Sequence, residues 1–275
     1  MEEQVRSNLI LGTVLESKDE IDKKIVDDTI NMIVGLQIGN FLIPEKKKDE
    51  EYFGHIMNVA ESLFKANSHR RRYIDQEKKI LEEFKNKCLT NTNTVDLSIN
   101  SVDLTSEIEG VLTQIKSALD SLARSFSPLL GLNLHGWHKK KKESGREVLD
   151  VIDKNLPNNL KDKSENLKNY IEKNIPWISY VVFLRDGIHR GGLKNISAII
   201  YRQTKKDVEP QHINYGNANE NVTSFITRLL NEITEFSNAV ILLSLLVKAP
   251  ENMCIVKNEG KEWPPYTWRI TNIDK

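Results

Sequence analysis

The sequence is poor in cysteine, and its two cysteines, Cys88 and Cys254, lie far apart without a Cys-x-x-Cys spacing. Such a pair supports neither a disulfide framework nor a cysteine-based zinc site, and it favours a reducing compartment. An excess of one charge is also missing, because 39 Lys and Arg residues balance 39 Asp and Glu residues. A neutral chain does not coat nucleic acid through bulk charge, so any such binding needs a local basic patch.

Long hydrophobic runs are absent as well. The longest apolar run, from Ala239 to Val247, is about half of the roughly 20 residues that cross a bilayer. The stretch from Leu9 to Leu15 lacks the basic leader and the small-residue cleavage site of an export signal. The content of large apolar residues is nevertheless ordinary, which excludes global disorder. We therefore expect a soluble, cytoplasmic protein that does not enter a membrane.

Several catalytic motifs are missing from the sequence. It has no P-loop, no dinucleotide-binding glycine fingerprint, no His-Glu-x-x-His and no Gly-x-Ser-x-Gly. His135 and His138 have a spacing seen in metal sites, but the glycine between them and the lysines that follow favour a solvated basic loop. His55 and His69 are interpreted as packing or surface histidines. We predict no metal and no cofactor.

Apolar residues recur at helical spacing along most of the chain. Ser17 with Glu20 resembles a capping box, and Ser127-Pro128 is expected to end a helix. The pattern is interrupted at 67–72. We predict helices over 18–42, from about 52 to 87, 104–126, 146–154, from about 161 to 173, 177–190 and 219–248.

These helices predict an all-α protein, a single domain over 1–275 built as an up-and-down helical bundle. Residues 90–103 form a polar linker, and 197–201 with 212–215 are expected to pair as a small, irregular or β appendage. Residues 250–275 are expected to form an extended C-terminal tail. The helix over 219–248 is apolar nearly all round in its second half, so we expect it to be central.

A basic loop follows Trp137. The lysines Lys139, Lys140, Lys141 and Lys142 stand next to this aromatic residue. An aromatic side chain beside clustered cations suits single-stranded nucleic acid, through base stacking and phosphate neutralisation. The alternative is a solvated charged loop, which is also how we interpret Arg70 to Arg72.

The sharpest feature lies at the end of the helix over 177–190. Asn174 is predicted to cap this helix, with Pro176 in its first turn. One face then carries Ile178, Val182, Arg185 and His189, so an apolar stripe leads into an Arg–His pair. Either a carboxylate holds Arg185 inside the bundle, or Arg185 lines a cleft. In a cleft, an arginine that stabilises developing charge beside a proton-transferring histidine would permit metal-free ribonuclease chemistry.

The stretch Leu184-Arg-Asp-Gly-Ile-His-Arg190, which follows an apolar helix, resembles the signature of the HEPN superfamily. Lys116 to Arg124 is similar to a helix of several HEPN-like families, and the resemblance covers about 47–249. Residues 1–46 would then be an N-terminal helical addition. The resemblance implies a helical bundle that dimerises through its motif helices, here 176–190, so that a composite site forms.

The resemblance also implies a function. HEPN members are commonly metal-independent endoribonucleases of toxin–antitoxin and phage-defence systems, and other members only bind. Arg185 would stabilise charge, His189 would act as general acid and base, and Asp186 would orient them. Arg190 and the lysine loop would guide RNA, and an antitoxin or defence protein would be a partner. The family usually has about four to six residues between Arg and His, whereas this chain has three, which still leaves both on one helical face.

Two alternatives stay open beside the ribonuclease. The first is a non-catalytic HEPN-like dimeric binding or scaffold protein, in which Arg185 has a structural role. The second is a helical bundle outside this superfamily.

Overall fold

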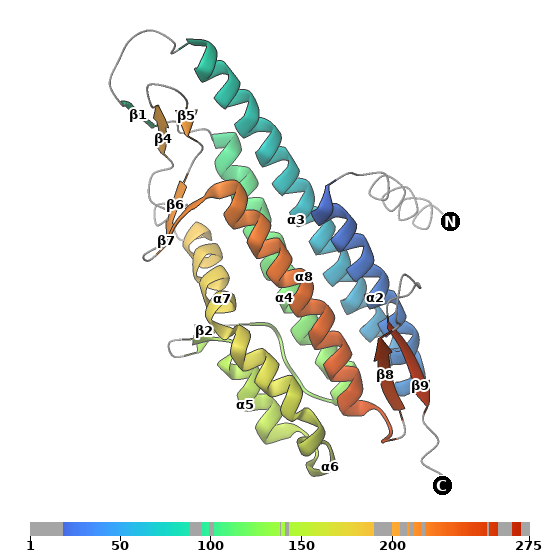
Figure 1. The fold of residues 1–275 in the computed structure, drawn as a ribbon. Helices are drawn as coiled ribbons and strands as arrows, with labels where there is room; N and C mark the ends of the chain where they lie inside the picture. Colours follow the sequence, from blue (N-terminus) through green and yellow to red (C-terminus); the bar gives the residue numbers. More distant parts are fainter. Residues whose placement is uncertain are drawn as a thin grey trace. The chain divides into compact units, whose positions relative to one another are not determined.

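The computed structural model of the chain is mostly helical, which confirms the all-α class (Figure 1). It describes residues 19–87, 95–98, 102–137, 139–140, 143–189, 200–203, 208–209, 212–215, 218–251, 253–257 and 266–270. The helices are α2 (Glu20–Leu42), α3 (Lys46–Lys87), α4 (Val102–Leu130), α5 (Arg146–Asn155), α6 (Asn158–Lys161), α7 (Glu165–His189) and α8 (Val222–Lys248), with the 3-10 turn η1 (Asp162–Ser164) before α7. The predicted helices over 18–42, 146–154 and 219–248 are therefore confirmed within a few residues.

The start of α2 differs from the prediction. Asp19, and not Ser17, is the N-cap residue, and its Oδ1 accepts a hydrogen bond from the Ile21 N–H at 2.9 Å. The expected capping box of Ser17 and Glu20 is wrong because the carboxylate two residues later caps the helix equally well.

The expected interruption at 67–72 is also wrong, because α3 runs through it without a break. Asn67, Arg70 and Tyr73 are buried, and the Arg70 Nε donates a hydrogen bond to Asn67 Oδ1 at 2.9 Å. The inward face of the helix thus continues with polar side chains that satisfy one another. Helical periodicity measured on apolar residues alone misses such a segment.

Pro128 does not end α4, which continues to Leu130. Pro128 lies in the last turn, so its missing N–H and the crowding of its ring against the Arg124 carbonyl affect only the end of the helix. The end comes at Gly131, whose φ of 73° is left-handed. Its N–H donates to the Ser127 carbonyl at 3.0 Å, and the Leu132 N–H donates to the Phe126 carbonyl at 3.3 Å. The Gly131 bond, which spans four residues, is the bond of the αL motif that commonly ends a helix at glycine.

The two helices expected over 161–173 and 177–190 are one helix, α7, with Pro176 inside it. Asn174 does not cap a new helix. Its Nδ2 donates to the Tyr170 carbonyl, and its Oδ1 accepts from the Trp177 Nε1, both at 2.8 Å. The Asn174 side chain therefore bridges the turn around the exposed proline, and the helix passes through it.

Short antiparallel strands occupy the connections. β1 (Val95–Ser98), β4 (Ile200–Gln203) and β5 (Val208–Glu209) form a sheet in the order β1-β4-β5, with Leu97 opposite Tyr201. β6 (His212–Tyr215) pairs instead with β7 (Ala218–Asn221). The predicted pairing of 197–201 with 212–215 is wrong, because β4 pairs with β1 and β5, whereas β6 pairs with β7.

Within the predicted extended tail over 250–275, the structure describes a hairpin of β8 (Met253–Lys257) and β9 (Tyr266–Ile270). A shorter hairpin of β2 (Lys139–Lys140) and β3 (Glu143–Ser144) lies in the basic loop.

The chain forms two compact units. The first is drawn from Met1–Ser62, Ser117–Ser179 and Ile233–Lys275, and the second from Leu63–Lys116 and Tyr180–Glu232. α3, α4, α7 and α8 therefore each contribute residues to both units.

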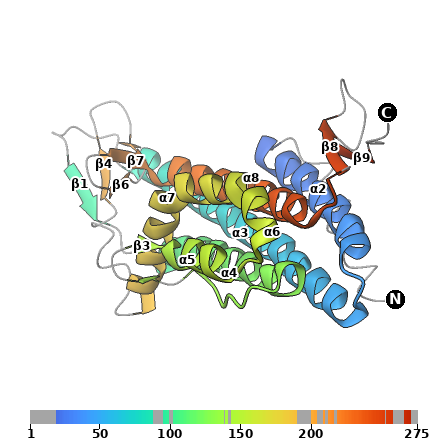
Figure 2. The ribbon, with the colours of Figure 1, turned by 90° about the horizontal axis from the view of Figure 1, so that it is seen from below.

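In the first unit, Phe236 of α8 is the centre of an aromatic cluster. The rings of Trp137 and Trp177 meet it edge-on, with centroids 5.4 and 5.6 Å away, and Tyr170 stacks on it at 5.9 Å. α2 lies against the same helix (Figure 2), and a Cβ on Gly35 would be 3.1 Å from Ile241.

In the second unit, α4 and the start of α8 bury their apolar faces, as predicted. A buried carboxylate of α3 joins this helix to the start of α8, since Glu77 accepts hydrogen bonds from Tyr73 of the same helix at 3.0 Å and from Thr223 of α8 at 2.8 Å. Arg228 is held by Glu220 and Glu232, and the hydrogen bond with Glu220 raises its pKa. The buried apolar side chains include Leu104, Ile108, Val111, Leu112, Ile115, Val222, Phe225, Ile226 and Leu229.

Among the described residues, one helix, α8, is long and apolar enough to cross a membrane by length and composition. Of its most apolar window, 56% is buried within the structure, which is typical of a core helix.

Candidate functional site

The Arg185 end of α7 belongs to the second unit and follows the predicted apolar stripe. Ile178 and Val182 are buried, and the Arg185 side chain, one turn further, is 34% exposed. Its Nη1 lies 3.3 Å from Oδ1 of Asp186, while its Nε is buried with no hydrogen-bond partner among the described residues. Among the described residues, Arg185 is therefore held only by its neighbour in the chain, through a long contact that leaves donor groups unused.

His189 is the last residue of α7, so both members of the predicted pair are helical. Their four-residue separation places them on one side of the helix. The side chain of His189 and all of Arg190 lie outside the described residues. The proposed contact between Arg185 and His189 therefore stays a prediction.

The prediction that Trp137 stacks nucleic-acid bases is wrong. Its side chain has no exposed surface, and it packs edge-on against Phe236. Its backbone N–H is fixed by Asp120 Oδ1 at 3.0 Å, and a Cβ on Gly145 would be 3.1 Å from its ring. An aromatic residue beside lysines in sequence is here a core residue, because the loop turns its aromatic side inward.

The outcome for the lysines of the loop differs from that for Trp137. Lys139 and Lys140 form β2, and the placement of their side chains lies outside the described residues, as do Lys141 and Lys142 entirely. A role for them in binding RNA stays a prediction.

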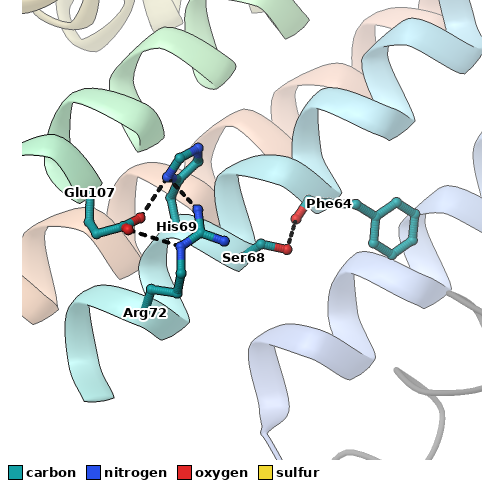
Figure 3. Close-up of polar contacts among 5 residues, drawn as sticks. All are labelled: Phe64, Ser68, His69, Arg72 and Glu107. Atoms are coloured by element: carbon teal, nitrogen blue, oxygen red, sulfur yellow. Dashed lines mark hydrogen bonds and ion pairs between the residues drawn. The ribbon is translucent and has the colours of Figure 1, made fainter. Parts of the chain in front are cut away.

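A second polar cluster, which no local sequence pattern predicts, joins α3 and α4 in the second unit (Figure 3). Glu107 of α4 uses both carboxylate oxygens. Oε2 lies 2.7 Å from Nδ1 of His69, and Oε1 accepts a hydrogen bond from Nε of Arg72 at 2.9 Å. The Glu107 side chain is only 14% exposed, whereas His69 is 26% and Arg72 50% exposed. We call these three residues the His69 cluster.

The proton positions in the His69 cluster follow from Glu107. Burial raises the pKa of this carboxyl, but hydrogen bonds from Arg72 and His69 more than offset burial, so the pKa is lowered. An ionised carboxylate only accepts, so Nδ1 of His69 must carry the proton that it donates to Glu107. Nη2 of Arg72 also lies 2.7 Å from Nδ1. We interpret that distance as the close approach of two donors that serve one carboxylate, and not as a hydrogen bond.

Gly110 lets the His69 ring approach α4. A Cβ at this position would overlap the ring, because it would lie far closer than van der Waals contact to Nδ1, Cε1 and Cγ. A glycine in a helix interior costs about 1 kcal/mol relative to alanine. The sequence therefore keeps an unfavourable helix residue at the point where the imidazole lies.

The local signals for this cluster were weak. His69 and Arg72 are three residues apart on one helix, and Gly110 interrupts a regular amphipathic pattern. Glu107 is 38 residues from His69 in the chain, and no local pattern joins the two.

No group of three His, Cys, Asp or Glu side chains that could hold a metal ion occurs among the residues that the structure describes. Within the same described part, His135 is exposed, and its backbone carbonyl accepts from Arg124 Nε at 3.2 Å.

Comparison with protein-family models, with curated proteins and with solved structures gives no match to this chain. The case for a family therefore rests on its own residues and their arrangement.

Proposed function

We propose that the protein is a HEPN-like, metal-independent endoribonuclease of a cytoplasmic toxin–antitoxin or phage-defence system. The observation that supports it best is the state of Arg185. Its guanidinium stands at the end of a buried apolar stripe, is one third exposed, and has only the adjacent Asp186 as an ion partner in the described part of the chain. A cation held this loosely has donors to offer to a phosphodiester oxygen.

The chemistry needs no cofactor. His189 would take the proton of an RNA 2′-hydroxyl, whose oxygen then attacks the adjacent phosphorus. The bond from phosphorus to the 5′-oxygen breaks, and a protonated histidine returns a proton to that leaving oxygen. Arg185 would stabilise the negative charge that develops on the phosphoryl oxygens, and Asp186 would keep the guanidinium in place. The products are a 2′,3′-cyclic phosphate and a 5′-hydroxyl.

A homodimer through 176–190 would bring two copies of this motif together, as the resemblance implies. Arg190, Lys139, Lys140, Lys141 and Lys142 would then attract the RNA backbone through charge alone, since Trp137 is not available for stacking. An antitoxin or defence protein would be a further partner.

A non-catalytic HEPN-like scaffold is the second candidate, and the contact between Arg185 and Asp186 favours it. In this pair the charge of the Arg185 guanidinium is neutralised by the Asp186 carboxylate. The motif would then serve only to assemble the dimer. This candidate predicts a dimer without RNA cleavage.

Purified wild-type protein, Arg185→Ala and His189→Ala separate the two candidates when they are incubated with RNA in excess chelator. The ribonuclease predicts products with cyclic phosphate ends, and a loss of about a hundredfold or more in both variants. Lys173→Ala removes an exposed charge from the same helix and should cleave like wild type. If all four proteins are equally stable and none cleaves RNA or slows growth on expression, the ribonuclease proposal is refuted.

A further inference from the structure

The exposed face of the first half of α3 carries a glycine, Gly54, whose free space no described residue fills. We propose that this face binds the same face of a second copy of the protein, with the two α3 helices antiparallel and crossing at Gly54. The residues concerned lie in the first unit, and the proposal does not depend on RNA cleavage at Arg185.

Gly54 differs from the other helical glycines whose surroundings the structure describes. A Cβ added at any of the others would meet a side chain from another helix; these glycines are Gly35, Gly39 and Gly110. A Cβ at Gly54 would meet nothing within 4 Å. Glycine is a poor helix residue, and the packing of the chain gives a reason for the other three but none for Gly54. A second backbone that approaches closely at this point supplies such a reason.

The surroundings of Gly54 have the composition of a contact surface. Phe53 is 52% exposed and Met57 37% exposed, and both lie to the same side of Gly54 on the helix. The residues one and two turns away from the glycine are exposed as well; they are Lys47, Glu50, Asn58 and Glu61. The face therefore combines two uncovered apolar side chains with a polar and charged rim, as protein contacts do.

Charge selects a second copy in the antiparallel orientation. When two α3 helices cross at Gly54 around a two-fold axis, residues equally far before and after the glycine meet. Lys47 of each copy then lies opposite Glu61 of the other, and Glu50 lies opposite Asn58, whose amide can donate to it. Each favourable pair occurs twice, and these pairs bring no like charges together. A parallel crossing would instead place Lys47 against Lys47.

The apolar side chains support the same geometry. The two-fold axis runs across both helices, so it places Phe53 and Met57 of the two copies on one side of the crossing, where they cover one another. Removing such side chains from water favours association, and the glycine lets the helices come close enough. A contact between one helix of each copy is small, so the dimer is expected to be weak.

Sedimentation equilibrium at about 1 to 300 μM protein tests the proposal, with an expected dissociation constant on the order of 10–100 μM. Gly54→Gln places a long, helix-favouring side chain at the crossing and should weaken dimerisation about tenfold or more. If residues 176–190 also join two copies, the same variant should reduce a larger assembly to a dimer.

The charges test the orientation. Lys47→Glu brings like charges together at two places and should weaken dimerisation about tenfold or more, and so should Glu61→Lys. Combining the two substitutions restores opposite charges at both places, so the dissociation constant should return close to the wild-type value. Lys79→Glu makes the same change of charge at an exposed position of the same helix outside the contact, and it should leave dimerisation unchanged.

Three outcomes would overturn the proposal. A protein that stays monomeric at about 300 μM would leave this face to a different partner or to solvent. Equal affinities of wild type and Gly54→Gln would place self-association elsewhere on the chain. A double charge variant that associates no more tightly than the single variants would exclude the antiparallel pairing. Should Gly54→Gln fail to fold, the charge variants decide the question, since their substitutions are at exposed helix positions.

Discussion

Asp28 in α2 is expected to make the protein less stable as the pH rises, and Asp28→Asn should remove this effect. Asn238 of α8 donates its Nδ2 to Asp28 Oδ1 at 3.0 Å, while Asp28 Oδ2 and Asn238 Oδ1 are both buried without a hydrogen-bond partner among the described residues. A single proton on Oδ2, donated to Asn238 Oδ1, would satisfy both atoms. Burial raises the pKa of Asp28 to about 6, against the attraction of Lys24 and with the help of Glu235.

The magnitude follows from that pKa. A rise from 3.8 to about 6 corresponds to ~3 kcal/mol for ionising Asp28 in the fold. We expect ~1–2 kcal/mol, because the carboxyl is not completely enclosed and solvent screens its charge. The folded pKa exceeds the unfolded one, so the stability from protonated Asp28 is complete below pH 3.8 and is lost as the pH rises through about 6. An asparagine stays neutral at every pH, and its Nδ2 can donate to Asn238 Oδ1.

The assay is urea unfolding of wild type and Asp28→Asn at about pH 4 and about pH 8. The advantage of the variant should be small at the lower pH and reach its full size at the higher one. Asp27→Asn, an exposed neighbour on the same helix, is the matched control and should change the pH dependence only slightly, because Asp27 contributes least to the raised pKa of Asp28. A difference between variant and wild type that is the same at both pH values would show that folding does not raise the pKa of Asp28, and the reasoning would fail.

Two packing predictions follow from the same unit. Gly39→Ala should destabilise by ~1–3 kcal/mol in denaturant unfolding, because its Cβ would lie 2.5 Å from Cε1 of the fully buried Tyr52. Gly54→Ala on α3 meets nothing within 4 Å and should instead be stabilising by up to ~1 kcal/mol, so a loss at both glycines would contradict the steric argument. Phe236→Ala should cost ~3–5 kcal/mol and weaken the near-ultraviolet dichroism of Trp137 and Trp177, which pack on this ring. Unchanged dichroism would mean that Phe236 is not the centre of the aromatic cluster.

The long apolar helices were predictable from the sequence because their periodicity reflects burial on one face. α8 is the clearest example, and its predicted central position agrees with the burial of Val240, Ile241 and Leu245. Helix ends were less predictable. Asn174, Pro176 and Pro128 are strong local signals for a boundary, yet side-chain hydrogen bonds and a late position in the helix let the helices continue.

The sequence also predicts a candidate site only where the residues of that site form a local pattern in the chain. Arg185 was identified because it interrupts an apolar stripe on its own helix, which is a local pattern. His69 was not identified, since its partner Glu107 comes from another helix and only the fold brings them together. The prediction that Trp137 stacks on bases is wrong because it relied on neighbours in the sequence. These neighbours are lysines, whereas the neighbour of Trp137 in space is Phe236.

The pairing of β1 with β4 also bears on how the chain folds. Val95 lies opposite Gln203, so this sheet closes a loop of roughly a hundred residues that contains α4 and α7. Contacts of such long range form slowly, whereas helices form from neighbours in the chain within microseconds. The small sheet is therefore expected to be a late step in folding, which closes the connections after the helices have formed.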